Sequence, residues 1–536
     1  MKYADDLNDI TNEFNLSSVE GKELTELYYD EIDFTLPREY LLSQAIVLNS
    51  RAQQLSSEFR YEDALVFLKR ALAIREQVLG VEHSDTAATC NEIALVYSDL
   101  GNYAEALEWH KEALEIYEQV LGVEHSYTAT VYNNAAAVYE KQGYYADALS
   151  WYKKALAIRE QVLGVEHPDT AATYNDIAGV FADLGAYSEA LLWYKQALAI
   201  YEHVLGVEHL LTATVYGNIA GIYYDQGVFA LALEWYKKTL AIREQVLGAE
   251  HPDTATIYNN IALVFTDQGA YADALEWYMK AVAIYEQVFG VEHSSTATIY
   301  DNIATVYEKQ GDYTEALEWY KNALAIRERV LGVEHPDTAT TCNNIALVFS
   351  RQGACDDALL WYKKAAAICE QVLGVDHPST ATIYDNIATL YEKQCDYAPA
   401  LKLYMKVLAI REQVLGVEHP DTATTYNNIA LVYSHQGVYE DALSWYEKAL
   451  AIYEHVLGVE HPSTGATYNG IAGVYSHLGD YTEAIGWYVK SYRIRMHKLG
   501  ESHPFTINTK IDMKSAYQKA GLTEPFDLWM QRNFGV

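Results

Sequence analysis

Histidine is the residue of this 536-residue chain whose spacing most suggests chemistry. Eleven of the 17 histidines occupy one position of a recurring Leu-Gly-x-x-His segment, with 42 residues between copies. These are His83, His125, His167, His209, His251, His293, His335, His377, His419, His461 and His503. A metal site needs three or four converging ligands, whereas one histidine per stacked unit spaces the rings roughly 10 Å apart. We therefore expect these histidines to satisfy loose backbone groups where the unit's second helix ends, as imidazolium ions favoured by the negative helix end.

Cysteine and the usual catalytic groupings offer no stronger signal. The five cysteines, Cys90, Cys342, Cys355, Cys369 and Cys395, form no C-x-x-C pair, which is typical of a reducing compartment. No Ser/His/Asp or Cys/His constellation stands apart from the 42-residue pattern. We predict that the chain is not an enzyme, that it has no catalytic residue, and that it binds no metal or cofactor.

Charge narrows the range of partners. The chain has 74 acidic against 38 basic residues, a formal net charge of −36, which argues against nucleic acid and anionic membranes. The acidic start MKYADDLNDIT is not a signal peptide, and no run approaches 18 apolar residues. We expect a cytoplasmic, soluble chain, a monomer rather than an oligomer, that binds proteins or peptides and no small-molecule substrate.

The 42-residue period itself predicts the fold, because a fixed period in this range is typical of a solenoid. In one unit, Asp421 is the expected N-cap of a first helix that ends at a left-handed Gly437. A second helix is expected from Tyr439 to Gly458. Each helix has one apolar stripe at 3.6-residue spacing, so neither can bury its apolar face without its neighbours.

These stripes resemble the tetratricopeptide repeat (TPR). Its pattern of aromatic, apolar-small pair and aromatic on the first helix is matched by Tyr426, Ile429-Ala430 and Tyr433. Ala442, Tyr446 and Ala449 match the second helix. The 42-residue period with LG-x-x-HPD is similar to the kinesin light chain subfamily. The resemblance implies an all-α, right-handed superhelix (an α-solenoid) of about 11 full helix-turn-helix units plus a C-terminal capping helix.

Three segments follow from this pattern. Residues 1–38 form an acidic N-terminal segment, 39–504 the tandem array, and 505–536 a degenerate capping repeat. The acidic and aromatic run 26–34 is expected to cap the first unit or to act as an internal pseudo-ligand. Residues 1–38 show no sustained heptads, unlike the coiled coil through which kinesin light chains join their motor. The expected function is a protein-interaction scaffold; a cargo or motor adaptor and a regulatory subunit that covers an enzyme remain alternatives.

The resemblance also implies where a partner would bind. In the family, the residues after the first aromatic of the first helix face the concave groove, where asparagine can pair with a peptide backbone. The corresponding asparagines are Asn133, Asn134, Asn175, Asn218, Asn259, Asn260, Asn302, Asn343, Asn344, Asn386, Asn427 and Asn428. Recent duplication of a useless residue is the alternative explanation.

Further along the same face, the residue two before the helix-ending glycine changes charge along the array. It is mostly acidic in the first half, as at Asp183 and Asp225, and becomes Lys309, Arg351 and Lys393 in the second. We predict a groove that takes a basic peptide segment toward the N-terminal units and an acidic one toward the C-terminal units. Scattered solvated charges are the alternative.

Overall fold

The computed structural model describes residues 32–57, 60–501 and 503–534. In this described part the chain forms 24 helices and no strand, and the helices pack as consecutive pairs. We call the odd-numbered helix of each pair helix A and the even-numbered one helix B. The helices are α3 (Arg38–Ser57), α4 (Tyr61–Leu79), α5 (Ser84–Asp99), α6 (Tyr103–Val120), α7 (Ser126–Lys141), α8 (Tyr145–Val162), α9 (Pro168–Asp183), α10 (Tyr187–Val204), α11 (Leu210–Asp225), α12 (Phe229–Val246), α13 (Pro252–Asp267), α14 (Tyr271–Val288), α15 (Ser294–Gln310), α16 (Tyr313–Val330), α17 (Pro336–Gln352), α18 (Cys355–Val372), α19 (Pro378–Lys393), α20 (Tyr397–Val414), α21 (Pro420–His435), α22 (Tyr439–Val456), α23 (Pro462–Leu478), α24 (Tyr481–Leu499), α25 (Pro504–Lys519) and α26 (Phe526–Phe534).

The predicted all-α solenoid is confirmed. Glycines end the helices as expected: Gly437, after helix A of its unit, adopts a left-handed φ of +77°. The same slot holds Cys395, the one described non-glycine residue with positive φ, at +60°. Residues 1–31, and with them most of the segment 1–38 and the run 26–34, lie outside the described residues.

The histidines have a different role from the one predicted. His419, not Asp421, is the N-cap of α21, and its Nδ1 accepts a hydrogen bond of 3.0 Å from the Asp421 backbone N–H. The same bond caps every helix A from α5 to α25. The ring therefore serves the start of the following helix A rather than the end of helix B. An Nδ1 that accepts must be unprotonated, so the expected imidazolium is wrong.

Helices A lie on the inside of the superhelix. Neighbouring helices A, such as α13 and α15, approach one another closely, and within the described residues neighbouring helices B do not approach to the same extent. Alanines with no exposed surface, including Ala430, Ala442 and Ala449, let the paired helices pack tightly. The layer between them also buries one tyrosine in each unit from α8 to α24, such as Tyr320 and Tyr446.

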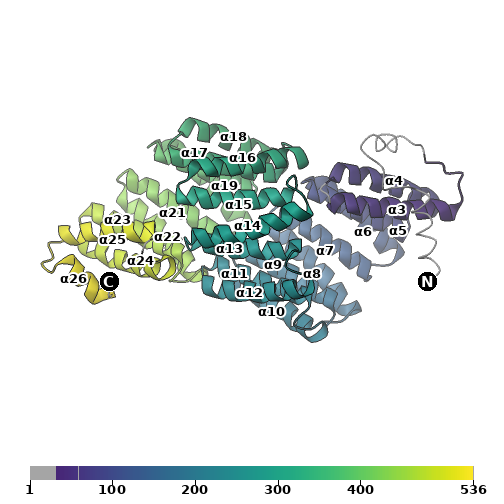
Figure 1. Ribbon diagram of the computed structural model, residues 1–536, viewed down its shortest axis with the longest axis horizontal. Helices are drawn as coiled ribbons and strands as arrows, with labels where there is room; N and C mark the ends of the chain where they lie inside the picture. Colours follow the sequence, from purple (N-terminus) through teal and green to yellow (C-terminus); the bar gives the residue numbers. More distant parts are fainter. Residues whose placement is uncertain (1–31, 58–59, 502, 535–536) are drawn as a thin grey trace.

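Successive turns of the superhelix touch. The His377 Nε2 lies 3.1 Å from the Lys141 carbonyl, and the His419 Nε2 lies 2.9 Å from the Asp183 carbonyl. Each pair is 236 residues apart, so one turn contains between five and six units. Because Nδ1 accepts, Nε2 carries the proton and donates to the carbonyl. Figure 1 shows the result: α17 and α18 of the second turn lie beside the first turn, end to end with its helices.

We call this junction the seam. On its second-turn side lie the His-Pro corners that begin helix A, and on its first-turn side lie the ends of helices A. A Cβ added to Gly185 would lie 2.6 Å from the Pro420 Cδ, so only glycine fits there. Burial in the seam lowers the pKa of His377 and His419, and that of His461 to about 4. The seam turns an open spiral into a tube.

Candidate peptide-binding face

The twelve predicted asparagines all lie on helices A, and all are half-buried. Several form a row of hydrogen bonds from unit to unit. The Nδ2 of Asn302 donates to the Oδ1 of Asn259 at 2.7 Å, and the Nδ2 of Asn386 donates to the Oδ1 of Asn343 at 2.9 Å. The remaining bonds of this kind are Asn134 to Asn91, Asn133 to Asp176, Asn218 to Asn175 and Asn428 to Asp385. Each joins two adjacent helices A at a spacing of 43 residues.

This row has a structural role that the sequence did not predict. One N–H of each donor amide is used to hold neighbouring units together, so the side chain is oriented rather than free. A carboxamide has two N–H groups and a carbonyl with two lone pairs. The bonds between units use only part of that capacity, and a peptide backbone could use the rest. Other members, such as Asn260 and Asn344, accept from the preceding residue in the same helix.

An acidic cluster lines the first turn of the same face. It consists of Glu140 of α7, Asp176 and Asp183 of α9, and Asp225 of α11. The charges of Asp183 and Asp176 raise the pKa of Glu140, and the charge of Asp183 raises that of Asp225. Desolvation is the larger cause, and it raises the pKa of Asp183 and Asp225 to about 6 and that of Glu140 to about 7. Asp183 and Asp225 nevertheless reach water. These two carboxylates are accessible to water but poorly hydrated, because the helices that form the tube surround them.

The predicted cations of the second half contact carboxylates of the same face. The Lys309 Nζ lies 2.5 Å from an Asp267 carboxylate oxygen, and the Arg351 Nε lies 2.7 Å from a Glu308 oxygen. The Lys393 Nζ donates to the Ser350 hydroxyl at 3.3 Å and also acts on the Glu308 charge. Each partner belongs to the preceding unit, except Glu308 for Lys393, which lies two units back. An acidic ligand would therefore compete with these internal partners.

Sequence reasoning missed Glu140, Glu308 and Glu392, which stand one residue before the charge series. All three have a raised pKa because protein surrounds them, and the Tyr152 hydroxyl donates to Glu140 at 2.9 Å. The sequence signal that could have found them is a glutamate in a position that other units fill with Ser, Thr, Ala, Tyr or Gln. In the described residues, no three His, Cys, Asp or Glu side chains are placed to hold a metal ion. Nor is any described helix both long and apolar enough to cross a membrane.

A family model of the tetratricopeptide repeat matches the chain in eight segments between residue 43 and residue 525. The matched ranges are 43–119, 127–203, 211–287, 295–371, 356–413, 379–455, 421–496 and 463–525. The chain belongs to the tetratricopeptide repeat family. TPR proteins are in general non-enzymatic scaffolds, and the repeats of this chain are of the kind that serves protein–protein interaction.

Solved structures similar to this TPR chain include kinesin light chain-like proteins. BtubC (BKLC) from P. vanneervenii is 22% identical, with a TM-score of 0.34, over 44% of this chain and 92% of its own. A putative kinesin light chain from Podosopora anserina with nearly identical TPR-like repeats is 26% identical, with a TM-score of 0.32, over 38% and 98%. A Rap protein complexed with Competence and Sporulation Factor is 17% identical, with a TM-score of 0.48, over 69% and 99%. No curated protein sequence matches significantly.

Proposed function

We propose that this TPR chain binds an extended peptide segment of a partner protein along the inner face of its helices A. The observation that carries the proposal is the row of oriented asparagine amides, which runs from unit to unit with hydrogen-bonding capacity to spare. Amides that pair with a peptide backbone grip it without reading its side chains. Specificity then comes from the charges that flank the row.

The width of the tube sets the shape of the ligand. Five to six helices A at a spacing of roughly 10 Å form a ring of roughly 9 Å radius, measured to the helix axes. The inner half of each helix takes up about 5–6 Å of that radius. The remaining space suits an extended chain, and it is too narrow for a helix about 10–12 Å across. The ligand is therefore an extended segment.

The charges set its composition. The first turn presents Asp183 and Asp225, which favour a basic segment of the ligand. In the second turn Lys309, Arg351 and Lys393 favour an acidic segment, but that segment must displace Asp267 and Glu308 from them. We expect the basic segment to contribute more affinity. All five cysteines are unpaired, which suits the reducing cytoplasm as the compartment of the partner.

Affinity purification from the source lysate with mass spectrometry tests this function. The amide variant is Asn218→Ala/Asn302→Ala/Asn386→Ala, and the control is Asn102→Ala/Asn322→Ala, which removes two exposed amides from outside the row. Circular dichroism first establishes that both variants fold. We expect partners of the native chain to be lost from the amide variant alone. Partners kept by both variants would place recognition outside the row and refute the proposal.

A further inference from the structure

The seam joins two surfaces that each recur at one end of the tube. The first is the starting rim, made of the first-turn His-Pro-like corners and the ends of helices B just before them. Its members are Val120, Val162, Val204, Val246, Val288, His83, His125, His167, His209 and His251. The second is the finishing rim, made of the ends of second-turn helices A. Its members are Gly311, Gly353, Cys395, Gly437, Gly479 and Gly521 with the residues that precede them.

The starting rim exposes apolar groups that the second turn covers. Val162 and Val246 are 47% and 49% exposed, whereas their counterpart Val414 is half-buried in the seam, where a Cβ on Gly143 would lie 3.5 Å from it. The His167 side chain is 39% exposed and that of His335 only 12%. The same positions are therefore open at one end of the molecule and covered in its middle.

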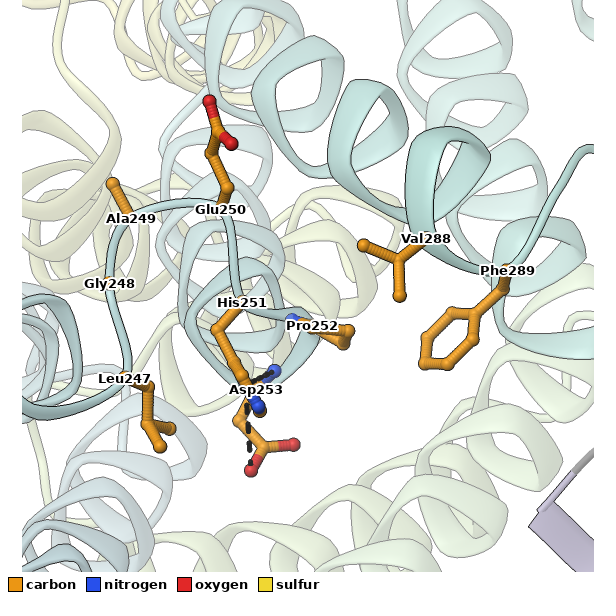
Figure 2. A pocket seen from close by; sticks show the side chains of 9 residues that line it. All are labelled: Leu247, Gly248, Ala249, Glu250, His251, Pro252, Asp253, Val288 and Phe289. Atoms are coloured by element: carbon orange, nitrogen blue, oxygen red, sulfur yellow. Dashed lines mark hydrogen bonds and ion pairs between the residues drawn. The ribbon is translucent and has the colours of Figure 1, made fainter. Parts of the chain in front are cut away.

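Open space remains where the starting rim ends. Figure 2 shows a hollow of about 890 Å³ around the corner that joins α12 to α13. Pro252 lies at its centre, with Val288 and Phe289 across from it.

The finishing rim has the complementary vacancy. A Cβ added to Gly143 or Gly185 meets a seam proline, whereas one added to Gly353, Gly437 or Gly479 meets nothing within 4 Å. The ends of the second-turn helices A therefore have the geometry of the first-turn ends, but no His-Pro corners pack against them. Among the described residues, both halves of one interface are therefore open, at opposite ends of the molecule.

We propose that a second copy of this chain docks its starting rim on the finishing rim, which continues the seam from one molecule to the next. Continuity with the seam is the main argument, since the counterparts of the two rims already bind each other within one chain. Such a contact is heterologous, so it leaves both outer rims open and adds copies without limit. The sequence favoured a monomer; the seam argues for open-ended, head-to-tail association.

Charge favours the contact between copies over the seam itself. Within the chain, Asp421 of a second-turn corner acts on Asp225 across the seam, which places like charges together. Between copies, Asp169 takes the place of Asp421, and its side chain is 64% exposed. It would meet Arg351 and Lys393, which occupy in the finishing rim the position that Asp225 occupies in the first turn. The contact between copies is therefore the better matched of the two.

Sedimentation velocity of the full chain over a wide concentration range, at physiological salt, tests the proposal. The rim variant is Val120→Glu/Val162→Glu/Val204→Glu/Val246→Glu. Its matched control is Val81→Glu/Val123→Glu/Val165→Glu/Val207→Glu, which adds the same charge at valines of the same corners. Those valines stay exposed on both sides of the seam, at 57% for Val123 and 56% for the second-turn Val333. Negative-stain electron microscopy at the highest concentration shows the shape of the assemblies.

We expect the native chain and the control to form ever larger species as concentration rises, seen as rods. The rim variant should lower the association constant at least about tenfold, because four carboxylates would be buried against apolar groups. A native chain that stays a monomer throughout, one that stops at a dimer, or a rim variant that associates like its control would each overturn the proposal.

Discussion

The hydrogen bond that each seam histidine donates can be removed without removing its N-cap. Asparagine accepts at an N-cap as well as any residue, but it is too short for its amide to reach a carbonyl of the preceding turn. The seam variant is His335→Asn/His377→Asn/His419→Asn, and the control is the same change at His83, His125 and His167. The match is close because residues 159–171 and 411–423 have one sequence, with His167 in the first and His419 in the second.

The size of the effect follows from the contacts. The three seam bonds measure 3.4, 3.1 and 2.9 Å, and each contributes roughly 0.5–1.5 kcal/mol net. The seam variant should therefore lose about 2–4 kcal/mol of unfolding free energy. The control removes rings that form no seam bond, one of which, His125, lies against the Tyr127 ring, and it should stay within about 0.5 kcal/mol of the native chain.

Urea unfolding followed by circular dichroism measures this difference, and small-angle X-ray scattering reports whether the turns separate. We expect a lower urea midpoint and a larger maximum dimension for the seam variant alone. Acid should remove the stability that these buried, neutral histidines contribute. The pKa of His377 and His419 is lowered by burial, so below pH 6.5 the unfolded chain binds protons that the folded chain does not. The contribution of these two histidines to stability therefore falls as the pH drops below 6.5, so the difference in stability between the native chain and the seam variant should narrow. Equal midpoints for the seam variant and the control would refute the seam as a source of stability.

Three further predictions concern single positions. His110 is buried in the layer's tyrosine position, its ring nitrogens have no partner among the described residues, and burial lowers its pKa to about 4. His110→Tyr should raise the unfolding free energy by about 1–3 kcal/mol, with Ser98 as partner for the hydroxyl, and an unchanged or lower urea midpoint would contradict this. Cys395→Gly should stabilise by about 1–2 kcal/mol because the φ of +60° strains any residue with a Cβ; a lower melting temperature would show that no strain is relieved. Binding of a basic peptide should weaken at least about tenfold from pH 7.5 to 5, as Asp183 and Asp225 with pKa values of about 6 take up protons. Anisotropy titrations across that range measure it, and a flat profile would exclude these two carboxylates.

The local structure was predictable from the sequence and the closure of the tube was not. The glycine at 437 and the apolar stripes predicted the helices, since those signals act within one unit. The seam depends on the small rotation between neighbouring units, summed over five to six units. This rotation cannot be predicted from the sequence of a single repeat. His419 was misread for this reason: one of its partners lies two residues away, and the other lies 236 residues away.

The candidate face was predicted in part. The asparagines lie on helices A, as the resemblance implied, and half-burial agrees with an inward-facing position. The bonds from Asn302 to Asn259 and from Lys309 to Asp267 were not predicted, because they depend on how closely adjacent helices A approach. Glu140 was overlooked because its importance comes from enclosure by the tube rather than from its residue type.

Titration of a fluorescein-labelled Lys-Ser repeat peptide, followed by anisotropy, tests most directly whether the inner face binds an extended basic segment. The groove variant is Asp183→Asn/Asp225→Asn, and the control is Glu166→Gln/Glu208→Gln, which removes the same charge from exposed corners. We predict saturable binding to the native chain and the control, and at least about tenfold weaker binding to the groove variant. Equal affinity for all three proteins, or no binding to the native chain, would contradict the proposed function.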